Sequence, residues 1–147
     1  MIATLIAISF LVLGAVYWIK RARDRRELEE HSITPEVLHG LLASNQEVLI
    51  FDVRLPLDLL ADSDVIPGAR RIPPKKLMEN PTLIPREKDT VVYCTCPSDK
   101  TSRVILHKAI GMNFPRIKFL KGGLDGWKAS GYPVEPYTES FHLDNGS

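Results

Sequence analysis

The sequence predicts an α/β fold in which helices flank a parallel sheet, preceded by one transmembrane helix. Residues 2–19 form an uncharged and mostly aliphatic stretch, which is unusual for a soluble chain of 147 residues. Residues 48–51 are a continuous apolar run, typical of a strand buried on both faces of a sheet, and residues 90–94 form a second strong strand pattern. Helical patterns separate these strands, and such an alternation indicates parallel strands.

The uncharged stretch is long enough to cross a bilayer. Its 18 residues would span about 27 Å as a helix, close to the ~30 Å hydrocarbon layer. Tyr17 and Trp18 lie at its end, where aromatic side chains favour the headgroup region. A cleaved signal peptide would need a basic segment before Ile2, and a buried core helix would need a polar face, of which Thr4 and Ser9 are the only members. We therefore expect a transmembrane helix at residues 2–19.

Charge is distributed unevenly along the chain. The net charge is +1, but residues 20–26 carry five basic side chains against one acidic side chain. The positive-inside bias then predicts a single-pass protein with residues 20–147 on the cytoplasmic side. Residues 20–31 are expected to form a charged helical linker. Without a basic field over the whole chain, no nucleic-acid partner is expected.

The remaining sequence predicts one globular domain at 32–137 and a disordered tail at 138–147. A helix is expected to begin at Thr34, because a capping hydroxyl, Pro35 and Glu36 follow one another there. The other elements are predicted from periodicity and apolar runs: a turn at 66–69, a short edge segment near 71–72, a helix at 100–110, a strand at 117–120 and a short helix at 124–130. In the helix at 100–110, Val104, Ile105 and Ala109 are expected to face inward.

The segment from Cys94 to Lys100 is the candidate site. It lies between a strand end and a helix start, where backbone N–H groups and the helix dipole form a cradle for an anion. Cys94 would lie at the base of this cradle, and the other residues of the anion-binding loop would be Thr95, Pro97, Ser98, Asp99 and Lys100. An inert buried thiol is the alternative for Cys94.

Four segments resemble the family of rhodanese-like sulfurtransferases. They occur in the family's order and spacing over residues 31–137. They are Asp52-Val53-Arg54; Val65-Ile66-Pro67-Gly68-Ala69, in which Val65 replaces a His; Val92-Tyr93-Cys94; and Gly122-Gly123-Leu124-Asp125-Gly126-Trp127 with Gly131-Tyr132-Pro133-Val134. The resemblance implies a rhodanese-like parallel sheet. It also implies that Cys94 accepts a sulfane sulfur as a persulfide and passes it to a thiophilic acceptor.

The loop departs from the family pattern at its end. The family places an Arg five positions after the cysteine, whereas here the nearest base is Lys100, six positions on. A lysine is a point charge and lacks the two-pronged geometry of a guanidinium. The longer loop resembles that of phosphatases with this fold, but those loops end in Arg. Two alternatives therefore stay open: a non-catalytic or redox-sensing module that docks a partner at the membrane, and a phosphatase.

The roles of three further residues are open from sequence. Cys96 is a candidate second thiol, either resolving an oxidised Cys94 or acting as the nucleophile itself. Asp52 is expected to accept hydrogen bonds rather than act as a base. Arg54 could line the pocket mouth or form a surface ion pair. With two cysteines and no nearby His, no metal site is expected. The resemblance to sulfurtransferases implies no organic cofactor, and it implies a small sulfur donor and a thiol acceptor as partners.

Overall fold

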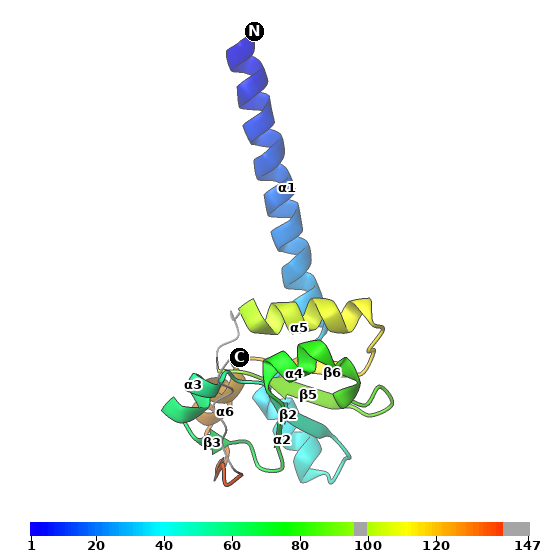
Figure 1. Cartoon of the computed structure of the whole chain (residues 1–147), viewed down its shortest axis with the longest axis vertical. Coiled ribbons are helices and arrows are strands. Elements are labelled where there is room, and N and C mark those ends of the chain that lie inside the picture. The colour runs from blue at the N-terminus through cyan, green and yellow to red at the C-terminus, as the bar shows by residue number, and fades with distance from the viewer. Residues whose placement is uncertain (96–99, 140–147) are drawn as a thin grey trace. The chain divides into compact units, whose positions relative to one another are not determined.

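The structure, a computed structural model, describes residues 1–95 and 100–139 (Figure 1). The chain divides into two compact units, residues 1–31 and residues 32–147. The predicted tail at 138–147 falls largely in residues 140–147, which lie outside the described residues.

The first unit is one uninterrupted helix, α1 (Ile2–Glu30). It covers both the predicted transmembrane segment and most of the predicted charged linker. None of its residues is buried, and it is long and apolar enough to span a membrane, a property that signal sequences share. In its basic half Arg23 and Glu27 form an ion pair at helical spacing, with the Nε and Oε1 atoms 3.4 Å apart.

The second unit is built on a five-stranded parallel sheet, which confirms the predicted fold class. In spatial order its strands are β1 (Ser32–Ile33), β6 (Ile117–Leu120), β5 (Thr90–Tyr93), β2 (Leu49–Asp52) and β4 (Arg70–Arg71). Because all five run in the same direction, their carboxyl ends share one edge of the sheet. Asp52 at the end of β2 is in register with Tyr93 at the end of β5.

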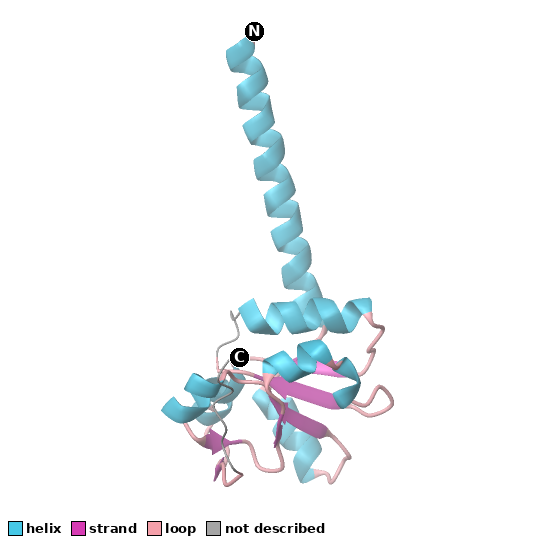
Figure 2. Ribbon diagram, in the orientation of Figure 1, coloured by secondary structure: helices cyan, strands magenta, loops and turns pink. Residues whose placement is uncertain are grey.

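Helices cover both faces of this sheet (Figure 2). On one face α2 (Pro35–Ala43) and α6 (Gly123–Ala129) pack against alternate residues of the strands, forming a core around Leu38, Tyr93 and Trp127. The hydroxyl of Thr34 accepts a hydrogen bond from the Val37 N–H at 3.3 Å, so the predicted cap begins α2.

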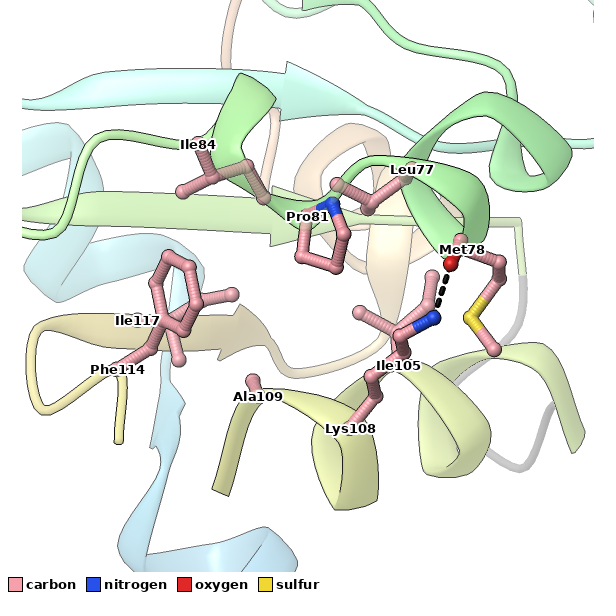
Figure 3. A pocket seen from close by; sticks show the side chains of 9 residues that line it. All are labelled: Leu77, Met78, Pro81, Ile84, Ile105, Lys108, Ala109, Phe114 and Ile117. Atoms are coloured by element: carbon pink, nitrogen blue, oxygen red, sulfur yellow. Dashed lines mark hydrogen bonds between the residues drawn. The ribbon is translucent and has the colours of Figure 1, made fainter. Parts of the chain in front are cut away.

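The opposite face carries α5 (Lys100–Gly111), α4 (Pro74–Glu79) and the 3-10 helix η1 (Pro81–Leu83). These helices and β6 enclose a small apolar hollow of about 20 Å³. Figure 3 shows its lining, together with the hydrogen bond that Lys108 donates to the Met78 carbonyl. Ile105 and Ala109 face inward as predicted, but the prediction for Val104 is wrong, since 43% of it is exposed. Of the three side chains predicted to face inward from α5, only Ile105 and Ala109 do so.

Two short segments complete the domain. β3 (Asp64–Val65) pairs antiparallel with β7 (Glu135–Pro136), and α3 (Pro56–Ala61) connects β2 to β3. Between β3 and β4 the Ala69 N–H donates to the Ile66 carbonyl at 3.0 Å, and Gly68 has a φ of 81°. This confirms the predicted turn, whose third position requires a left-handed residue.

Candidate functional site

Cys94 directly follows β5, at the edge where the parallel strands end. It is buried, with 5% of its surface exposed. The peptides around it are held from two sides: the Val53 N–H donates to the Tyr93 carbonyl at 3.0 Å, and the Leu124 N–H donates to the Cys94 carbonyl at 3.0 Å. The position of Cys94 is thereby fixed by the segments after β2 and β6.

Gly123 lies directly against the peptide of Cys94. Its φ is 55°, and a Cβ atom placed on it would lie 2.1 Å from the Cys94 carbonyl oxygen. No side chain fits there. Gly122 and Gly123 both have positive φ, which glycine adopts without strain, and the sequence did not reveal that Gly123 touches the peptide of Cys94.

The predicted anion loop is described at its two ends. Thr95 is half-buried and follows Cys94, and Lys100 is the first residue of α5. Cys96, Pro97, Ser98 and Asp99 lie outside the described residues. A helix of 12 residues begins at Lys100, directly after this loop in the chain, as the sequence predicted, and the N-terminal end of a helix carries a partial positive charge.

Asp52, the last residue of β2, forms an internal ion pair with Arg54. Each residue is 1% exposed. The Arg54 guanidinium donates to the Asp52 carboxylate through Nε at 2.9 Å and through Nη2 at 2.7 Å. Arg54 therefore lies neither at a pocket mouth nor in a surface ion pair, because β2 delivers it to the interior beside a carboxylate.

The Arg54 guanidinium also donates two hydrogen bonds to backbone carbonyls. Nη1 donates to the Asp62 carbonyl at 2.8 Å and Nη2 to the Asp64 carbonyl at 2.8 Å. Burial alone would lower the pKa of Arg54, but the hydrogen bonds and the charge of Asp52 outweigh it and hold this pKa above its ordinary value. The pair thus anchors the segment between α3 and β3.

Tyr93 is a member of this network that the sequence reasoning missed. Its hydroxyl donates to the Asp52 carboxylate at 3.0 Å and accepts from the Ile66 N–H at 3.3 Å. Burial, followed by the negative charge of Asp52, raises the pKa of Tyr93 well above its ordinary value. The signal available in the sequence was a single phenol in an otherwise aliphatic strand, since a buried hydroxyl requires a partner.

A surface cluster supports the same loop from outside. The Lys128 ammonium lies 2.5 Å from a carboxylate oxygen of Asp62 and 2.9 Å from one of Asp64. These contacts lower the pKa of Asp62 and raise that of Lys128. Within residues 1–95 and 100–139, no three His, Cys, Asp or Glu side chains are grouped so as to hold a metal ion.

The fold and the placement of Cys94 define the chain as an α/β domain with a cysteine at the carboxyl edge of its sheet. The model of the rhodanese-like domain family matches residues 34–130. The chain belongs to this family.

The chain is similar to several known proteins in sequence or in fold. A sulfurtransferase of Allochromatium vinosum is 28% identical over 104 residues, covering 71% of this chain and 94% of that protein. The crystal structure of a rhodanese-related protein from Thermoplasma volcanium has a TM-score of 0.58 at 25% identity, over 71% of this chain and 97% of that one. The solution structure of a rhodanese-like domain from Anabaena has a TM-score of 0.59 at 27% identity, covering 80% and 87%.

Proposed function

We propose that the chain is a membrane-anchored sulfurtransferase that carries sulfane sulfur as a persulfide on Cys94. The observation that carries this proposal is the placement of Cys94 at the carboxyl edge of β5, with the Cys94 peptide held by Leu124 and Gly123. A nucleophile that must accept and release an atom benefits from such a fixed position. The similarity to a sulfurtransferase supports the same reaction class.

The first half-reaction is an attack of the Cys94 thiolate on the outer sulfur of a small donor such as thiosulfate. An S–S bond forms between Cys94 and that sulfur, the S–S bond of thiosulfate breaks, and sulfite leaves with the electron pair. In the second half-reaction a thiol acceptor, as its thiolate, attacks the outer sulfur and restores the Cys94 thiolate. The N-terminal end of α5 supports both steps, because its dipole favours a negative charge beside the loop.

The test is mass spectrometry of the full chain in detergent after incubation with thiosulfate. We expect a peptide containing Cys94 to gain the mass of one sulfur atom, and an added thiol acceptor to remove it. Cys94→Ser should abolish the adduct, and Cys96→Ser is the matched control that should retain it. A folded protein with both thiols open to alkylation and no sulfur on Cys94 would overturn the proposal.

The burial of Cys94 favours a second candidate function, a non-catalytic or redox-sensing module that docks a partner at the membrane. The replacement of a family His by Val65 and the lysine at position 100 fit this function too. The rate of alkylation as a function of pH distinguishes the two. A Cys94 thiol that titrates near the ordinary value of about 8.5 favours the module, and one that titrates well below it favours the enzyme.

We further propose that α1 is a membrane anchor with its N-terminus outside and the rhodanese-like domain in the cytoplasm. The support is the basic excess that directly follows the uncharged residues 2–19. A reporter fused after Ser147 should be active on the cytoplasmic side. Activity only on the exterior side would reverse the orientation and would make the two cysteines candidates for an oxidised pair.

A further inference from the structure

The Thr95 hydroxyl is a buried hydrogen-bonding group without a partner among the described residues. Its oxygen is closed to solvent, yet no donor or acceptor in residues 1–95 or 100–139 reaches it. A buried polar group without a hydrogen bond destabilises the folded state, so the unpartnered Thr95 hydroxyl requires an explanation. Thr95 follows the cysteine that we propose as the sulfur carrier.

Thr95 directly follows Cys94, and the backbone of both residues lies against the segment after β6. The Cys94 carbonyl accepts the Leu124 N–H, and a Cβ on Gly123 would lie 3.0 Å from the Thr95 carbonyl oxygen as well as 2.1 Å from that of Cys94. Neither peptide has room to rotate toward Gly123. The branched side chain of Thr95 also has few rotamers. The backbone that carries this hydroxyl is therefore held in place directly after the cysteine.

We propose that the Thr95 hydroxyl binds the outer sulfur of the persulfide on Cys94, an inference that rests on the proposed function. Loading places a new anionic acceptor about 2 Å beyond the Cys94 sulfur, the length of an S–S bond. The thiol of the unloaded protein is not a partner of this hydroxyl, because Cys94 is among the described residues. The hydroxyl thus gains its hydrogen bond when sulfur arrives, and it stabilises the loaded state selectively.

The measurement is the equilibrium between the loaded and unloaded protein. Cys94 thiolate and thiosulfate yield the Cys94 persulfide anion and sulfite, so both sides carry the same charge and no proton is exchanged. The full chain in detergent is equilibrated at several ratios of thiosulfate to sulfite, and the loaded fraction on the Cys94 peptide is read by mass. The ratio at half-loading reports how strongly the protein holds the outer sulfur.

We expect Thr95→Val, which keeps the shape and removes the donor, to need a roughly tenfold higher ratio of thiosulfate to sulfite, the effect of losing one hydrogen bond to a charged group. Thr95→Ser keeps the hydroxyl and should load as the unmodified protein does. The pH midpoint for alkylation of unloaded Cys94 should be the same in all three proteins. Should Thr95→Val fail to fold, Thr95→Ala removes the same donor.

Three outcomes would overturn the inference. Equal half-loading in Thr95→Val and the unmodified protein would show that the hydroxyl does not hold the sulfur. An equal loss in Thr95→Ser would show that the methyl group, not the donor, is responsible. A shifted alkylation midpoint would place the effect on the thiol. If the unmodified protein takes up no sulfur, the proposed function itself fails, which is distinct from all three.

Discussion

The Asp52 carboxylate and the Arg54 guanidinium form an ion pair inside the domain, with 1% or less of either side chain exposed. One carboxylate oxygen also accepts the hydroxyl of Tyr93, so the pair links the end of β2 to the end of β5. Tyr93 immediately precedes Cys94. The network that holds the sheet edge together is therefore adjacent to the candidate nucleophile.

Removal of Arg54 should unfold the domain readily. Arg54→Met would leave the Asp52 carboxylate buried without its counter-charge, and losing one partner of a buried pair costs about 3–5 kcal/mol. The measurement is urea unfolding followed by the fluorescence of Trp127, which is 1% exposed, in a Trp18→Phe background. Lys88→Met is the matched control: its ion pair with Glu47 is exposed, and its loss should leave the unfolding midpoint unchanged. Equal midpoints for Arg54→Met and the control would contradict the prediction.

Tyr93 should make the domain sensitive to alkali. The raised pKa of Tyr93 in the folded state means that its contribution is complete below the unfolded value of about 10 and falls as the pH rises above it. In that range the free energy of unfolding should decrease by up to ~1.4 kcal/mol per pH unit on account of this phenol. Unfolding titrations of Tyr93→Phe should lack this part of the decline, although the variant is less stable near neutrality. Parallel curves for the two proteins above pH ~10 would argue against it.

Gly123→Ala should disturb both stability and sulfur uptake. The added Cβ meets the Cys94 carbonyl at 2.1 Å, whereas a Cβ on Gly131, whose φ is 78°, meets nothing within 4 Å. Both variants carry the strain of a left-handed alanine, about 1–2 kcal/mol. The clash should add roughly 1–3 kcal/mol in Gly123→Ala alone, as overpacking does. Urea unfolding and sulfur loading of the two variants test this prediction. Equal losses of stability and of loading in Gly123→Ala and Gly131→Ala would contradict it.

The contact of Lys128 with Asp62 should contribute little to the free energy of unfolding, and it should do so only while the Asp62 carboxylate is charged. The pKa of Asp62 is lowered, chiefly by the Lys128 hydrogen bond, so its contribution is present above the unfolded value of about 3.9 and is lost as the pH falls. Both side chains are about one-third exposed, and solvent screening limits the effect to less than ~1 kcal/mol. The difference in unfolding free energy between the unmodified protein and Lys128→Met should vanish in acid and in high salt. A difference that persists below pH ~3 would be inconsistent with this origin.

The principal strands and helices could be predicted because their signals are local. The segments predicted as strands at 48–51, 90–94 and 117–120 correspond to β2, β5 and β6, and the cap at Thr34 began α2. The two-residue strands β1, β3 and β7 could not be found in this way, since pairing with distant segments alone defines them. Short helices such as α3 and α4 span fewer than two turns, too few to show a period.

The candidate site also has some features with a local sequence signal and others that depend on distant segments. Cys94 could be placed at a strand end from its own neighbours, and Asp52 could be recognised as an acceptor. The burial of Arg54 and the hydroxyl contacts of Tyr93 depend on carbonyls and N–H groups contributed by residues 62–66. Such contacts are decided by tertiary packing, and no pattern within one segment specifies them.

The contacts of Leu124 and Gly123 with Cys94 can form only late in the synthesis of the chain. They join residues that are about thirty positions apart, and β6 with its following turn is made well after β5. A chain still on the ribosome that has not yet emerged beyond residue 124 possesses the cysteine but lacks the groups that fix its peptide. The candidate site is consequently assembled only once most of the domain has been synthesised, so an incomplete chain carries the cysteine without the contacts that hold its peptide.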